Sequence, residues 1–214
     1  TSNSLILSDA EAAFHLLCPT GVGLMVSVGT GVICLGRNSQ GNTYIVAGDG
    51  HEKDLGSSFW IGQKIIEHVI INESLLDVDI DLKEIYNIIL QTFDINRLDE
   101  LSILFEKRSE MVCKTASLAK CIVLLAEKGN DVALSVIHEA TRHVAEYIMI
   151  LVDKLKYQNK DIVISANGSL MKNLFYRKLI NESLEFDFNI IHWVHSDISP
   201  AYGAGLMAGA YKNI

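Results

Sequence analysis

Val26-Ser-Val-Gly-Thr-Gly-Val32 joins two apolar, β-branched runs, and the second run continues as Ile33-Cys34-Leu35. This pattern predicts two antiparallel strands joined by a tight turn, because β-branched residues favour strands and glycine adopts the positive φ values common in hairpin turns. Gly29-Thr30-Gly31 also supplies backbone N–H groups that can converge on a phosphate. The sequence fits an ordinary hairpin turn and a phosphate-binding turn equally well.

The residues around this turn predict a strand-rich first part of the chain. Ser8 precedes acidic residues and good helix formers, so we expect it to cap a short helix, with Asp9 at the point where the loop enters that helix. A polar, glycine-containing loop over 48–56 leads into a helix that begins near Ser57. Between these helices, an antiparallel meander of three strands is expected over 24–28, 32–37 and 43–47.

The second part of the chain changes from helical to alternating periodicity. Apolar residues recur at helical spacing from about 82 to 157, with a stop and a new cap at Gly129-Asn130-Asp131. The clearest helices of this block are expected over 98–105, 111–125 and 132–155. The remainder predicts a β-α-β-α order with parallel strands: strand 161–165, helix 169–179, strand 188–193 and a small-residue helix 201–211.

Composition limits the classes of ligand. The chain has 214 residues, 49% of them hydrophobic, and can bury a sizeable core. A net charge of −8 disfavours binding to nucleic acid or to an anionic membrane, so small molecules are the expected ligands. No apolar run is long enough to span a bilayer and no signal peptide opens the chain. We therefore expect a cytoplasmic protein.

Cysteines and histidines do not predict a metal site. Neither histidine pair, His138 with His143 or His192 with His195, has the spacing of metal ligands. The cysteines have no C-x-x-C pairing and lie among apolar residues, which indicates reduced and mostly buried thiols: Cys18, Cys34, Cys113 and Cys121.

Six short motifs follow one another along the chain, at 8–10, 28–31, 48–62, 129–133, 164–169 and 200–204. Ser8-Asp9-Ala10 resembles an Asp-Ala element, and Val28-Gly29-Thr30-Gly31 resembles a Gly-Thr-Gly-Ser phosphate motif. Together the six motifs resemble the C-terminal lobe of the sugar kinase, actin and heat-shock chaperone superfamily, and within it the N-acetylglucosamine kinase and BadF/BadG-type ATPase family. The resemblance runs almost from end to end of the chain.

The resemblance implies an α/β fold, namely a ribonuclease-H-like (actin-like ATPase) lobe. Its mixed five-stranded sheet would carry an inserted all-helical block over about 72–157, and residues 1–214 would form a single C-terminal lobe. No segment resembles the family's N-terminal phosphate motif of the Asp-Gly-Gly-Gly-Thr type. We therefore expect a fragment, or one half of a split protein, that is nearly inactive without an N-terminal lobe supplied in cis or in trans.

The implied activity is ATP-dependent phosphorylation of a hydroxyl of N-acetylglucosamine or a related hexose, with Mg²⁺ brought by the nucleotide. Asp9 would be the catalytic residue that accepts the hydroxyl proton, although an aspartate at a helix entry can also simply support its own helix. Gly29, Thr30 and Gly31 would bind the phosphates of ATP through backbone N–H groups and the threonine hydroxyl.

The resemblance also assigns substrate and nucleotide residues. His51 and Asp54 lie in the loop that it places over the sugar, where the alternative is a solvated surface loop. Asn167, Gly168 and Ser169 lie where a strand ends and a helix begins, and they would bind the adenosine side of the nucleotide. No residue is expected to hold a metal directly.

Several residues depart from the family pattern, and they leave other functions open: Val32, Asp49, Leu55 and Asn167. A sugar- or nucleotide-sensing module without catalysis is one alternative. An ATPase activator of a dehydratase is another, although no cysteine lies in a glycine-rich loop suited to an iron–sulfur cluster.

Two helical features have more than one interpretation. Ile148, Leu151, Val152 and Leu155 fit either the contact of a homodimer or core packing. Gly203 and Ala204 open the last predicted helix, and their small side chains favour close packing over nucleotide binding.

Overall fold

In a computed structural model of the chain, which describes residues 8–104, 108–195, 202 and 205, five strands form one mixed sheet in the order β3-β2-β1-β4-β5. Its first three strands form the predicted antiparallel meander, and β4 and β5 add to β1 as parallel strands. The predicted fold class is confirmed. The strand bounds are β1 (Gly23–Val28), β2 (Val32–Arg37), β3 (Thr43–Ala47), β4 (Asp161–Asn167) and β5 (Ile190–His195).

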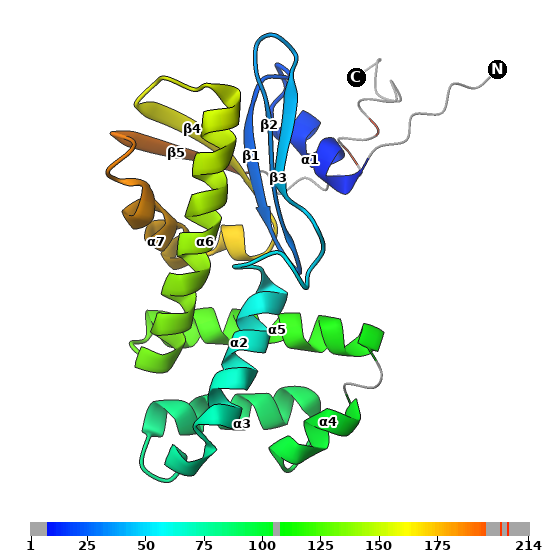
Figure 1. The fold of residues 1–214 in the computed structure, drawn as a ribbon, viewed down its shortest axis with the longest axis vertical. Helices are drawn as coiled ribbons and strands as arrows, with labels where there is room; N and C mark the ends of the chain where they lie inside the picture. The colour runs from blue at the N-terminus through cyan, green and yellow to red at the C-terminus, as the bar shows by residue number, and fades with distance from the viewer. Residues whose placement is uncertain (1–7, 105–107, 196–201, 203–204, 206–214) are drawn as a thin grey trace, which may run out of the picture.

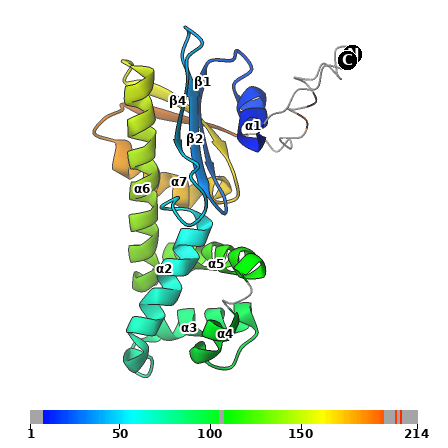
Figure 2. The same cartoon turned by 45° about the vertical axis from the view of Figure 1, so that its right-hand side comes forward.

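Helices cover both faces of the sheet (Figure 2). On one face, α1 (Asp9–Leu17) buries Phe14 against Met25 and Leu35, in a small separate core. On the other face, α6 (Asp131–Leu155) packs on β2 and β3, and α7 (Leu174–Leu184) packs beside α6. The second face carries the main core, because its cluster of apolar side chains continues from the sheet into the helices below it.

The inserted helices form a tier at one end of the sheet (Figure 1). They are α2 (Ser58–Ile71), η1 (Glu73–Leu75), α3 (Ile80–Phe93), η2 (Leu98–Glu100), α4 (Leu101–Leu104) and α5 (Arg108–Glu127). The predicted cap at Asn130 is confirmed, since its side chain accepts a hydrogen bond from the Ala133 N–H at the start of α6. From this tier α6 runs back along the sheet, so it contacts both the other helices of the insertion and the strands β2 and β3.

The apolar face of α6 belongs to the core. Ile148 and Leu151 are wholly buried, Val152 is 5% exposed, and Leu155 packs partly buried against the same cluster. Core packing therefore explains these four side chains.

Two predicted elements differ in the structure, and a third falls largely outside the described residues. The predicted helix 169–179 is divided into η3 (Leu170–Lys172) and α7, because Asn173 leaves the helical conformation and caps α7 by accepting the Tyr176 N–H. The last strand begins at Ile190 and ends at His195, two residues later than predicted. The predicted helix 201–211, with Gly203 and Ala204, lies outside the described residues except for Tyr202 and Gly205.

All four cysteines are free thiols. Cys18 and Cys34 are buried as predicted, and burial raises the pKa of the Cys34 thiol. Cys121 is half-buried and Cys113 is exposed, both on α5. Among the described residues, no helix combines the length and apolar character needed to cross a bilayer, and no three potential ligands gather into a metal site.

The insertion depends on a close crossing of α2 and α5. A Cβ at Gly62 would overlap the carbonyl oxygen of Thr115, so only glycine permits this approach. The same contact buries the Thr115 side chain, which is 1% exposed, and its hydroxyl has no hydrogen-bond partner within the described part of the chain. A buried hydroxyl without a partner lowers stability.

Thr115→Val should therefore raise the free energy of unfolding by about 1 kcal/mol, because it replaces an unpaired hydroxyl with a methyl group of similar size. Thr141→Val is the matched control, since Thr141 is equally buried but donates to the carbonyl oxygens of Ile137 and His138. That change should lower the free energy by a similar amount. Urea unfolding of both variants checks the difference, and equal effects would contradict the assignment.

Candidate functional site

A pocket of about 520 Å³ lies where the β1–β2 turn, the end of β4 and the start of α1 meet. Because β1 and β4 are parallel neighbours with Ser27 opposite Asn167, the turn after β1 and the end of β4 reach the same edge of the sheet. The loop after β3 completes the wall. The pocket brings together most of the predicted site residues: Asp9, Gly29, Thr30, Gly31, His51, Asp54 and Asn167.

Asp9 presents an exposed carboxylate at this pocket, at the first position of α1. The cap of α1 does not use it. Ser8 Oγ accepts the Glu11 N–H, and the Glu11 carboxylate accepts the Ser8 N–H, both in a capping box. These bonds with Ser8 also lower the pKa of the Glu11 carboxyl. The Asp9 side chain therefore remains available to a ligand.

The Gly-Thr-Gly turn exposes two of its three N–H groups. Gly29 donates to the Gly31 carbonyl at 2.9 Å, whereas the N–H groups of Thr30 and Gly31 have no acceptor among the residues that the structure describes. The Gly29 N–H is thus used inside the turn, and phosphate binding by Gly29 stays a prediction. Thr30 and Gly31 keep the two donors that an anion needs.

The sequence predicted that this turn contains glycine because of positive φ values, but the structure gives a steric reason for glycine at position 31. The hairpin is confirmed by the pairing of Val28 with Val32, but neither Gly29 nor Gly31 has a positive φ. A Cβ at Gly31 would lie only 2.7 Å from Asp54 Oδ2. Glycine is required at Gly31 because a carboxylate packs against it.

Asp54 joins the loop after β3 to this turn. Its side chain is buried, and Oδ2 accepts the Val32 N–H at 3.1 Å. Its other oxygen, Oδ1, accepts the N–H groups of Gly48 and Asp49, each at 3.0 Å. We predicted that Asp54 binds substrate, but three backbone donors already occupy its carboxylate. These bonds hold the loop after β3 against the β1–β2 turn, and substrate binding by Asp54 stays a prediction.

Among the loop residues that line the pocket, His51 has a side chain that forms no hydrogen bond with the described residues. Its ring is half-buried and stands edge-on to the Phe59 ring, with centroids 4.7 Å apart. This contact orients the imidazole without using either ring nitrogen. His51 thus offers a polar group to the pocket, and its contact with a sugar stays a prediction.

Asn167 and its neighbours close the far side of the pocket. Asn167 Nδ2 donates to Ser27 Oγ at 3.0 Å, which fixes the amide across two neighbouring strands. Gly168 has φ +88°, and a Cβ there would overlap the Val28 carbonyl oxygen, so the chain must turn here as glycine. Asn167 lines the pocket, whereas Gly168 and Ser169 follow behind it and lead into η3 rather than into a long helix.

Ser27 is a pocket residue that sequence analysis missed. The available signal was a polar side chain between Val26 and Val28, inside an otherwise apolar strand. Alternation sends Ser27 to the face of the sheet that α1 covers, while its two neighbours join the main core on the opposite face.

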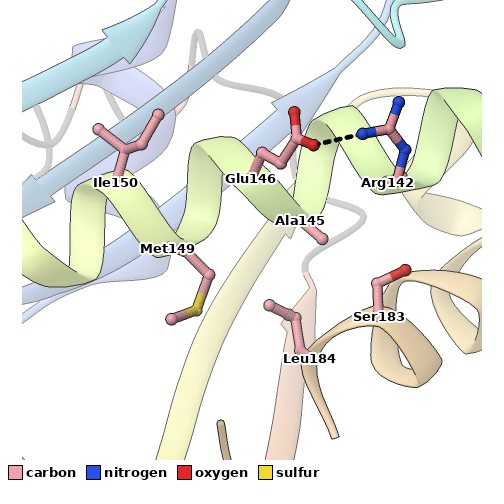
Figure 3. A pocket seen from close by; sticks show the side chains of 7 residues that line it. All are labelled: Arg142, Ala145, Glu146, Met149, Ile150, Ser183 and Leu184. Atoms are coloured by element: carbon pink, nitrogen blue, oxygen red, sulfur yellow. Dashed lines mark hydrogen bonds and ion pairs between the residues drawn. The ribbon is translucent and has the colours of Figure 1, made fainter. Parts of the chain in front are cut away.

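A second pocket, of about 420 Å³, lies between α6 and α7 (Figure 3). Met149 and Leu184 point into it, and its two charged residues, Arg142 and Glu146, pair with each other at 2.6 Å. None of the predicted site residues lines it. The pocket at the end of the sheet is therefore the candidate functional site.

Asp54→Asn should lower the free energy of unfolding by about 1–3 kcal/mol, because an amide cannot accept bonds on both sides and would leave a buried backbone donor unpaired. Asp49→Asn is the matched control, since its exposed side chain bonds no described residue. Urea unfolding followed by circular dichroism measures both. Identical midpoints for the two variants would contradict the role of Asp54.

Comparisons with known proteins place the chain beside sugar kinases, although no protein-family model matches it. It is 27% identical over 189 residues to an N-acetylmuramic acid/N-acetylglucosamine kinase of Clostridium acetobutylicum, covering 83% of this chain. The match covers 59% of that relative, so the chain spans about three fifths of its length.

Two solved structures share the fold. A putative N-acetylglucosamine kinase from Chromobacterium violaceum superposes with a TM-score of 0.70 at 16% identity, over 94% of this chain and 64% of that one. Another from Porphyromonas gingivalis gives 0.60 at 16% identity, over 94% and 65%. The resemblance to N-acetylglucosamine kinases is confirmed, and the chain has the fold of an actin-like ATPase.

Proposed function

We propose that this chain is part of an ATP-dependent kinase that phosphorylates a hydroxyl of N-acetylglucosamine or a closely related hexose. The observation that carries the proposal is the pocket at the end of the sheet. It combines an exposed carboxylate, two backbone N–H groups that have no acceptor among the described residues and an oriented histidine, which come from separate segments of the chain. The name of the curated relative supports the choice of an amino sugar.

Asp9 is the proposed catalytic residue. A carboxylate beside a sugar hydroxyl can accept its proton and orient its oxygen toward the phosphate that is transferred. Because the capping box is complete without Asp9, no hydrogen bond of the α1 cap occupies this carboxylate.

Thr30 and Gly31 are the proposed phosphate-binding residues. Their N–H groups fit an anion, since fixed backbone donors stabilise the charge on transferring phosphate oxygens without reorganising. Mg²⁺, bound to the phosphates, would neutralise further charge during transfer. The described residues contain no cluster of carboxylates for the metal, so the nucleotide would bring it.

His51 and Asn167 lie on different sides of the turn and so have different proposed partners. His51 belongs to the loop after β3 and would donate or accept a hydrogen bond with a sugar hydroxyl or an acetamido group. Asn167, with Gly168 and Ser169, would contact the nucleotide. Val32 and Asp54 would shape the site through the backbone rather than touch the ligands.

We further propose that these residues belong to a C-terminal lobe and that phosphoryl transfer requires the complete protein. The share of the relatives that the chain spans supports this arrangement. The test compares the complete gene product with residues 1–214 on a panel of hexoses and N-acetylhexosamines. ATP-dependent phosphorylation by the complete protein alone is expected. Absence of turnover with nucleotide still bound would overturn the kinase and favour a sensing module.

Asp9→Asn in the complete protein should lower kcat by roughly 10²–10⁴-fold, the usual contribution of a positioned base, with a much smaller change in KM for the sugar. Glu11→Gln is the control, because it removes a negative charge from the same helical turn and weakens the cap directly. Steady-state kinetics of both variants decides the role. Equal losses in the two would mean that Asp9 only supports its helix.

A further inference from the structure

The end of the loop after β3 forms hydrogen bonds with two tyrosines, which lie far along the chain on α6 and α7. Tyr176 on α7 donates its hydroxyl proton to the Gly56 carbonyl oxygen at 3.1 Å. Tyr147 on α6 accepts the Leu55 N–H at 3.2 Å. The two hydroxyl groups thus bind adjacent residues of the loop, immediately after Asp54.

The bond from Tyr176 is the stronger constraint. Tyr176 is wholly buried, and its hydroxyl is the one partner recorded for the Gly56 carbonyl among the described residues. Burial raises the pKa of Tyr176, so its proton stays in place to be donated. Tyr147 is half-buried, and burial raises the pKa of its hydroxyl as well. Loss of the Tyr176 hydroxyl would leave a buried carbonyl unpaired.

The surroundings of Gly56 leave little room for the loop to relax. Gly56 is buried with φ +79°, and a Cβ there would lie 2.5 Å from the Ala140 carbonyl oxygen on α6. The backbone therefore lies directly on α6. Two residues earlier, Asp54 attaches the same loop to the β1–β2 turn on its other side.

We propose that Tyr147 and Tyr176 are positioning residues that hold residues 48–57, and with them His51, at the correct distance from the Gly-Thr-Gly turn. Neither side chain lines the pocket, so both act through the loop. The consequence for substrate binding rests on the proposed function. If the loop carries the sugar contacts and the turn carries the phosphate contacts, loss of the tyrosine bonds weakens sugar binding selectively.

Tyr176→Phe tests the attachment directly, by amide hydrogen exchange of the complete protein. Exchange of the amides in residues 48–57 should accelerate roughly tenfold, the effect expected from one lost hydrogen bond to a buried carbonyl, while α3 and α5 remain unchanged. Tyr147→Phe should give a smaller change in the same segment. Unchanged exchange in this segment for both variants would overturn the proposal.

Tyr157→Phe is the matched control. Its hydroxyl donates to the Asp161 carbonyl at 2.8 Å, the same kind of bond, but at the opposite end of β4 from the pocket. Removing it should leave exchange of residues 48–57 at the wild-type rate. Acceleration by all three variants alike would mean a general loss of stability and would overturn the positioning role.

Kinetics of the same variants tests the link to substrate. Tyr176→Phe should raise KM for the sugar substrate roughly tenfold and leave KM for ATP within about twofold of the wild-type value. Faster exchange with unchanged KM for the sugar would overturn the positioning role. A wild-type protein that phosphorylates no sugar would instead refute the proposed function, and the exchange measurement would still decide whether the tyrosines hold the loop.

Discussion

The candidate site depends on one buried carboxylate that binds backbone from two segments. Asp54 accepts hydrogen bonds from Val32 in the hairpin and from Gly48 and Asp49 in the following loop. Bonds from three N–H groups offset the cost of burying its negative charge, which would otherwise be large. Since the carboxylate also packs against Gly31, the shape of the turn and the position of the loop are set by the same group.

The order of the strands determines which segments meet at the pocket beside Asp54. Because β4 adds in parallel beside β1, its end carries Asn167 to the turn that follows β1, about 140 residues earlier in the chain. The inserted helices lie at this same end of the sheet, where the Ser58 N–H at the start of α2 donates to the Gly29 carbonyl oxygen, and α6 runs back along β2 and β3. In this arrangement α6 and α7 support the loop after β3, because their tyrosines form hydrogen bonds with Leu55 and Gly56.

Polar groups in the pocket divide into those already bonded and those left for a ligand. The carboxylate of Asp54 and the N–H of Gly29 have partners within the protein, and the amide of Asn167 uses Nδ2 to bind Ser27 Oγ. The Asp9 carboxylate and the N–H groups of Thr30 and Gly31 have no hydrogen-bond partner among the described residues. The two N–H groups belong to the same hairpin turn as the bonded N–H of Gly29. A rigid frame that leaves a carboxylate and fixed donors unpaired suits the binding and transfer of phosphate.

Local sequence by itself determined the elements whose signals lie within a few residues: the Ser8 and Asn130 caps, the β1–β2 hairpin and the meander. Short motifs in order also identified most pocket residues. Only the tertiary structure decided which hydrogen bonds Asp54 and Gly29 form and that Cys113 is exposed. It also brought Tyr147 and Tyr176 into contact with the loop. Hydrogen bonding and exposure depend on which distant segments meet, and the spacing of residues along a chain carries no record of those partners.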